Sequence, residues 1–130
     1  MDATLCNQCH DSGGAGLTIH GTNRVSEIGV CVVCHNPDAT DINRRPADPS
    51  TTPDGKREEA GDFKRMIHQI HAGSDLQDGL VIYGYGGTPH EYGTVHFIGN
   101  LENCETCHVT DAYSTEDARA ASPSTIDTGA

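Results

Sequence analysis

The cysteines of this chain occur only in three copies of the motif Cys-x-x-Cys-His, at residues 6–10, 31–35 and 104–108. This spacing is the attachment signature of c-type haem, in which the two thiols form thioether bonds with the haem vinyl groups. The histidine that follows then binds the iron on its proximal side. We therefore predict three covalently bound haem c groups. The predicted thioether residues are Cys6, Cys9, Cys31, Cys34, Cys104 and Cys107, and the predicted proximal iron ligands are His10, His35 and His108.

Other roles for a Cys-x-x-Cys pair explain this sequence less well. A single pair is compatible with half of a zinc site or with a redox-active dithiol. Three pairs cannot all combine into four-ligand zinc sites, because one pair is left over. A disulfide framework explains the even number of cysteines but not the histidine after each second one. The repeated histidine therefore favours haem.

The composition leaves little material for a conventional hydrophobic core. Of the 130 residues, 35% are hydrophobic and 5% aromatic, with two Phe and no Trp, so a protein core would be thin at this length. Three porphyrins would supply the missing apolar surface. We expect a multihaem cytochrome c fold organised around packed haems, mostly irregular with a few short helices and a small hairpin. The haem-free protein is expected to be largely unfolded.

The charge and hydropathy restrict the partners and the location. A net charge of −11 argues against binding to nucleic acid or to anionic membrane surfaces, and no run approaches the roughly 20 apolar residues of a membrane span. No basic segment followed by an apolar stretch marks a signal peptide. Because haem c is attached outside the cytoplasm, we nevertheless expect export to the periplasm or the cell surface. The expected partners are other redox proteins or extracellular electron acceptors, and a homo-oligomer or filament stays open.

One amphipathic helix is predicted at residues 56–72, with an apolar stripe formed by Phe63, Met66, Ile67 and Ile70. Thr52 or Asp54 would cap its start and Gly73 its end. The preceding residues 36–55 contain four of the six prolines and are predicted to form a surface loop.

Two short strands are predicted at residues 80–83 and 94–98, on either side of a glycine-rich turn. A short helix over residues 101–109 is expected to carry the third motif. We predict a trihaem domain at residues 1–113. The remainder, residues 114–130, is expected to be a flexible tail or linker, because it is almost without large apolar side chains.

Five histidines lie outside the motifs and are candidates for the distal position on three irons: His20, His68, His71, His90 and His96. Methionine is scarce, with only Met1 and Met66, so bis-histidine coordination is favoured. His68 and His71 are the strongest candidates, because residues three apart project from one side of a helix. His20 follows, since it lies between the first two motifs. His90 and His96 are alternates.

The chain resembles the outer-surface decahaem cytochromes of the OmcA/MtrC family. The resemblance rests on residues 31–37, 63–73 and 103–108, and on His20-Gly21 ahead of the second motif. It spans residues 5 to about 110 and retains the order motif, lone histidine, motif, His-x-x-His helix, motif. Family members carry ten haems, whereas this chain has three motifs, so the resemblance implies a three-haem fragment or a minimal relative.

The resemblance implies bis-histidine haems packed edge to edge for extracellular electron transfer to minerals, shuttles or partner cytochromes. His10, His35 and His108 would be the proximal ligands, and His20, His68 and His71 the distal ones. No catalytic residue is predicted, because an electron carrier needs only position, ligand field and exposure from its protein. The alternative is a multihaem reductase with one open haem iron, acting on an oxyanion or a nitrogen compound.

Overall fold

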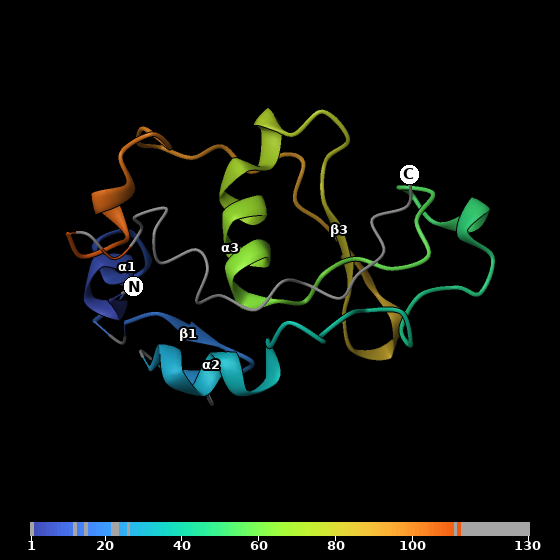
Figure 1. The fold of residues 1–130 in the computed structure, drawn as a ribbon, viewed down its shortest axis with the longest axis horizontal. Coiled ribbons are helices and arrows are strands. Elements are labelled where there is room, and N and C mark those ends of the chain that lie inside the picture. The colour runs from blue at the N-terminus through green and yellow to red at the C-terminus, as the bar shows by residue number, and fades with distance from the viewer. Residues whose placement is uncertain are drawn as a thin grey trace. The chain divides into compact units, whose positions relative to one another are not determined.

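The computed structural model describes residues 2–11, 13–14, 16–21, 24–25, 27–110 and 112. These residues fall into two compact units. The first combines the chain up to Cys34 with the segment from Glu102, and the second runs from His35 to Leu101 (Figure 1). The predicted tail at residues 114–130 lies outside the described residues.

The first unit consists of short elements that carry the motifs. Its elements are α1 (Ala3–His10), β1 (Thr18–Ile19), β2 (Arg24–Val25), α2 (Ile28–Cys34) and the 3-10 turn η4 (Cys104–Thr106). Asp2 caps α1 by accepting a hydrogen bond from the Thr4 amide at 2.9 Å, which satisfies one of the unpaired donors of the first turn. Strands β1 and β2 pair in antiparallel register, Thr18 with Val25 and Ile19 with Arg24. Neither this hairpin nor helices α1 and α2 had been predicted from the sequence.

The second unit contains the longest helix and a second hairpin. Its elements are η1 (Pro49–Thr51), α3 (Phe63–Ala72), η2 (Gly73–Asp75), β3 (Val81–Tyr83), η3 (Tyr85–Gly87) and β4 (Pro89–Glu91). The two strands pair antiparallel, with Ile82 opposite His90. The general architecture of a few short helices and a small hairpin in a mostly irregular chain is as predicted.

Helix α3 begins seven residues later than the predicted start at residue 56. Its N-cap is Asp62, whose side chain accepts a hydrogen bond from the Arg65 amide at 3.1 Å, so Thr52 and Asp54 are not caps. The residues before the cap are extended instead, because they pair with residues 39–41 through the Thr40–Ala60 bridge. The predicted C-cap at Gly73 is confirmed, with its amide donating to the Gln69 carbonyl.

The second strand of the hairpin is β4, so the predicted strand at residues 94–98 is wrong. A shorter turn, residues 84–88, brings β4 against β3. Residues 94–98 lie against the end of α3 instead, where the Ser74 amide donates to the Val95 carbonyl at 2.9 Å. An ideal Cβ on Gly73 would lie 2.3 Å from that same carbonyl oxygen, so the close approach requires glycine.

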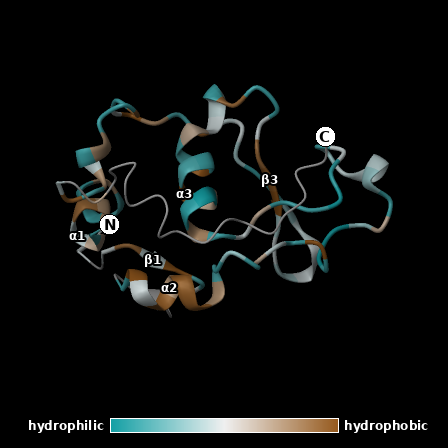
Figure 2. Cartoon of the chain, viewed as in Figure 1, coloured by the Kyte–Doolittle hydropathy of each residue, from teal (hydrophilic) through white to brown (hydrophobic). Residues whose placement is uncertain are grey.

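Among the residues that the structure describes, the buried apolar ones belong to the second unit: Ala60, Phe63, Leu80, Val81 and Tyr83. Residues 36–55, which were predicted to form a surface loop, are partly buried. They contribute the buried side chains of Asp41, Arg45 and Thr52 to this region. By contrast, α1 and α2 bury no residue, although α2 is strongly hydrophobic (Figure 2). Among the described residues, no helix is both long and apolar enough to span a membrane.

Candidate haem centres

The first motif lies on α1. Cys6 and Cys9 are three residues apart on this helix, so both thiols project from one side, and His10 is its last residue. The Cys6 thiol is half-buried and lies 3.6 Å from the Asp2 carbonyl oxygen, whereas Cys9 is exposed. Two thiols on one side of a helix, followed at once by an imidazole, are the local geometry that covalent haem attachment requires.

The second motif lies at the end of α2, with Cys31 and Cys34 again three apart and His35 directly following the helix. The residues between the thiols are apolar but uncovered, since Val32 and Val33 are exposed and Val33 retains 72% of its accessible surface. Two exposed valines within an attachment motif provide an apolar surface that a haem attached there could cover.

The third motif forms a single tight turn rather than the predicted helix over residues 101–109. The amides of Cys107 and His108 both donate to the Cys104 carbonyl, at 3.2 and 2.9 Å. The His108 bond is an α-helical i to i−4 contact, so this turn reproduces locally the arrangement that α1 and α2 give the other two motifs.

The first and third motifs, although about 100 residues apart, are neighbours within the first unit. Burial raises the pKa of the Cys6 thiol above its ordinary value, and the nearby Cys107 raises it further. Burial likewise raises the pKa of Cys107, with additional contributions from Cys9 and Cys104. These thiols therefore lie within electrostatic reach of one another, and Figure 1 shows the η4 segment beside α1.

All six cysteines are free thiols, so the structure contains no disulfide framework. Within the part of the chain that is described, no group of three or more His, Cys, Asp or Glu side chains is arranged to hold a metal ion. The local geometry of each motif, with two thiols and an imidazole on one short turn, is compatible with haem attachment.

In helix α3, the His68 and His71 rings each contact the backbone carbonyl four residues earlier. The Nδ1 atom of His68 lies 2.7 Å from the Lys64 carbonyl oxygen, and that of His71 lies 2.8 Å from the Ile67 carbonyl oxygen. A carbonyl oxygen only accepts, so Nδ1 carries the hydrogen in both rings and Nε2 is the nitrogen with a lone pair. This is the tautomer and orientation typical of metal-ligating histidines.

His35 of the second motif shows the same relationship with a distant partner. Its Nδ1 atom lies 2.8 Å from the Gly61 carbonyl oxygen, and its own carbonyl accepts a hydrogen bond from the Phe63 amide at 2.9 Å. The predicted proximal ligand is therefore tied to the segment just ahead of α3, with Nε2 again as the nitrogen that could bind iron.

His20 lies in the turn that follows β1 and is exposed. Its backbone has a φ of 56°, which makes it the only residue other than glycine with a positive φ among the described residues. Left-handed backbone costs roughly 1–2 kcal/mol for an ordinary residue, and such strain is concentrated at functional sites. The conformation sets His20 apart from an ordinary surface histidine.

The two alternate distal candidates, His96 and His90, differ in how accessible their Nε2 atoms are. The His96 Nδ1 atom lies 2.9 Å from the Ser74 hydroxyl, an arrangement compatible with Nε2 as a ligand. In β4, the His90 ring lies over Gly84, so that an ideal Cβ there would be 2.6 Å from the His90 Nε2 atom. His90 is therefore the less suitable ligand of the two, because its Nε2 faces the hairpin turn.

Each of these histidines was predicted from the sequence, but the groups that orient them were not. The helical carbonyls of Lys64 and Ile67 were predictable, because a histidine in a helix can reach the carbonyl four residues earlier. The Gly61 carbonyl and the Ser74 hydroxyl were not predictable, since their contacts with His35 and His96 span 26 and 22 residues.

These observations define a class, the c-type cytochromes with several attachment motifs. The family model for MtrC/MtrF-like outer membrane cytochromes, domains II/IV, matches residues 1–128, and the chain belongs to this family. No curated protein and no solved structure matches it significantly. Membership confirms, at the level of the family, the resemblance described above. It supports covalently bound haem c, electron transport rather than classical enzyme catalysis, and an exported, cell-surface protein.

Proposed function

We propose that this chain is an electron-carrying module with three bis-histidine haems, serving extracellular electron transfer. The proposed proximal ligands are His10, His35 and His108, and the proposed distal ligands are His20, His68 and His71, with His96 before His90 as an alternate. Haem c supplies one-electron redox chemistry when it is bound. The protein contributes attachment, orientation of the ligands and control of exposure.

One observation carries the proposal: three imidazoles of the second unit are held through Nδ1 by a backbone carbonyl. In His35, His68 and His71 this bond leaves Nε2 as the ligating nitrogen and increases the basicity of the ring. A protein that uses its histidines as iron ligands accounts for all three.

The placement of the motifs supports contact between haems. The thiols of the first and third motifs interact within one unit, so haems attached there would be neighbours. On α3, the two imidazoles are three residues apart, and a rise of about 1.5 Å per residue places them roughly 4.5 Å apart along the axis. Two irons bound by one short helix would be fixed relative to each other, which favours electron exchange between them.

The surface charge favours particular partners. The chain has a net charge of −11 before any haem propionates are counted. Acceptors or partner cytochromes with a positively charged contact face would be steered toward it, and the attraction would weaken with salt. We propose other redox proteins and extracellular acceptors as the partners, with a homo-oligomer as a further arrangement.

The test combines intact mass with ligand binding. The matured protein should exceed the polypeptide mass by three haems, and its reduced form should bind carbon monoxide poorly because all three irons are six-coordinate. Two haems or fewer would contradict the trihaem proposal. Stoichiometric carbon monoxide binding to one haem would favour the reductase with an open iron instead.

A further inference from the structure

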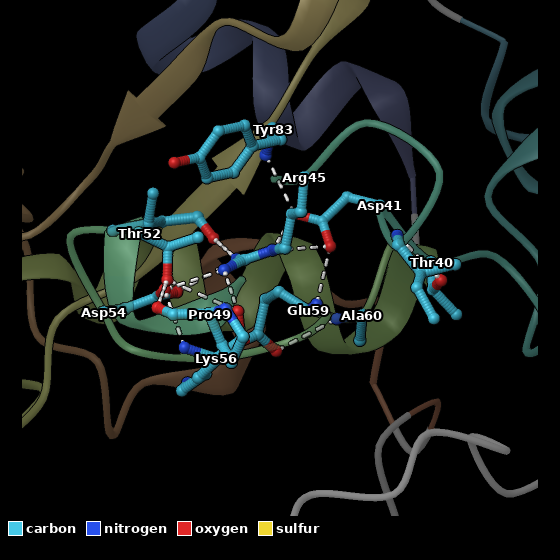
Figure 3. A network of polar contacts seen from close by, with 12 residues as sticks. Thr40, Asp41, Arg45, Pro49, Thr52, Asp54, Lys56, Glu59, Ala60 and Tyr83 are labelled. Atoms are coloured by element: carbon cyan, nitrogen blue, oxygen red, sulfur yellow. Dashed lines mark hydrogen bonds and ion pairs between the residues drawn. The ribbon is translucent and has the colours of Figure 1, made fainter. Parts of the chain in front are cut away.

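The second unit contains a buried network of charged residues that none of the proposed haem ligands belongs to. At its centre is Arg45, whose side chain has no accessible surface. Its Nε atom donates to both carboxylate oxygens of Asp41 at 2.8 Å, and its two terminal nitrogens donate to Asp54 at 2.7 and 2.9 Å (Figure 3). The guanidinium also donates to the Val81 carbonyl at 2.6 Å.

Burying these charges is costly, and stability alone explains the network poorly. The desolvation of a buried ion pair commonly cancels its attraction, so apolar residues of equal volume would often stabilise a fold as well. The Asp41 carboxylate, however, also accepts two backbone amides, from Glu59 at 2.7 Å and from Tyr83 at 2.9 Å. The main effect of the network is therefore to fix the backbone at Glu59 and Tyr83, rather than to lower the net free energy of the fold.

The backbone positions that the network fixes lead directly to a motif histidine. Glu59 and Ala60 lie in the extended segment that pairs with residues 39–41, and the Gly61 amide donates to the Ala39 carbonyl at 2.7 Å. The next group along this segment is the Gly61 carbonyl, which accepts the His35 Nδ1 hydrogen at 2.8 Å. Asp41 is thus connected to the His35 imidazole through the paired backbone of residues 59–61.

We propose that Asp41 and Arg45 are positioning residues for His35, because they fix the Gly61 carbonyl that orients its imidazole. This inference rests on the proposed role of His35 as an iron ligand. A firmly held acceptor on Nδ1 makes the imidazole a stronger donor and favours the ferric state of the iron that it binds. Loosening the carbonyl should therefore raise the reduction potential of one haem and reorient the plane of its proximal imidazole.

The test compares two variants that each remove one negative charge beside the same guanidinium. Asp41→Asn replaces one acceptor oxygen by a donor, so that either the Glu59 or the Tyr83 amide loses its partner. Asp54→Asn removes a charge that Arg45 also contacts, but Asp54 is not hydrogen-bonded to residues 59–61. Both proteins are examined with their haems bound, by spectroelectrochemistry and by electron paramagnetic resonance of the ferric state.

In Asp41→Asn, one haem should show a raised potential and altered g values, because g values follow the relative orientation of the two axial imidazole planes. In Asp54→Asn, the g values should stay as in the unsubstituted protein, whatever the potential does. Arg45→Lys, which conserves charge, should reproduce the change in g values. Equal potential shifts in the two aspartate variants, with unchanged g values in all three variants, would show a purely electrostatic effect and overturn the proposal.

If these variants do not incorporate their haems, a measurement on the unsubstituted protein tests the same proposal. The Nδ1 hydrogen of His35 should exchange with solvent more slowly than that of His71, which is also half-buried but whose carbonyl partner, Ile67, lies outside the network. Equal exchange rates would overturn the inference. A mass that shows no haem on the second motif, or unchanged axial ligation in His35→Ala, would instead refute the proposed function.

Discussion

The imidazole Nδ1 of His35 and the carbonyl oxygen of Gly61 lie 2.8 Å apart, although 26 residues separate them. The Phe63 amide returns to the His35 carbonyl at 2.9 Å, so the end of the second motif and the start of α3 are joined by two bonds. Both partners belong to the second unit. The helix that presents two candidate distal ligands is therefore fixed at its start to a candidate proximal ligand.

Replacing either distal candidate on α3 should change one haem. In His68→Ala and in His71→Ala, one of the proposed three haems should become five-coordinate and high-spin, because each variant removes one axial nitrogen. Ferric absorption spectra and electron paramagnetic resonance measure this. His90→Ala is the control and should stay low-spin, since the His90 Nε2 faces Gly84. Fully low-spin spectra in both α3 variants would exclude these ligands, and His96 would be tested next.

Gly73 should tolerate no side chain. Gly73→Ala places a methyl group 2.3 Å from the Val95 carbonyl oxygen at a φ of 34°, so we expect a loss of about 2–5 kcal/mol in the free energy of unfolding. Gly86→Ala is the matched control, because its φ is also positive, at 74°, but nothing lies within 4 Å. Its cost should be about 1–2 kcal/mol. Thermal unfolding of the haem-loaded proteins compares them, and equal losses would show that the contact with Val95 is unimportant.

The buried network should make the second unit sensitive to acid. Burial alone would raise the pKa of Asp54, but hydrogen bonds from Arg45 and the Lys56 amide outweigh it and bring the pKa below its ordinary value of 3.8. A carboxyl with a lowered pKa stabilises the fold above its unfolded pKa, and this contribution is lost as the pH falls through the folded value. The contribution of Asp54 should therefore be fully present and independent of pH near neutrality, and stability should fall below about pH 4.

Asp54→Asn tests this pH dependence. The variant should be less stable than the parent at neutral pH, and the difference between the two proteins should shrink as the pH drops below about 4. Denaturant unfolding at a series of pH values measures it. A difference that is constant down to pH 2 would show that folding does not lower the pKa of Asp54.

The reduction potentials should be low and spread over a broad range. Two histidine ligands lack the raising effect of methionine, and an acidic surface favours the more positive ferric state. Haems in contact also repel as each is oxidised, so their titrations are coupled. Spectroelectrochemistry checks this. A single one-electron wave at a clearly positive potential would contradict bis-histidine ligation and close packing, and would direct attention to Met66.

Some of this structure was predictable because the relevant interactions are local. The attachment residues follow from five-residue motifs, and the pair His68 and His71 follows from helical periodicity. The start of α3 was predicted too early because residues 56–62 match a helical pattern. Residues 59–61 pair with residues 39–41 instead, and periodicity does not reveal that partner. Asp41 and Arg45 looked like loop residues for the same reason, since their partners Glu59, Val81 and Tyr83 are distant in sequence.

Helix α3 is capped at both ends, by Asp62 and by Gly73, and His68 and His71 lie between the two caps. Each residue advances a helix by about 100°, so the two imidazoles point about 60° apart. Deleting one residue between them would turn them to nearly opposite sides, about 160° apart, whereas a deletion elsewhere in an exposed loop changes no such angle. Relatives that use both histidines should therefore vary in loop length but show no gap within this helix, because its rotational phase is what natural selection must preserve.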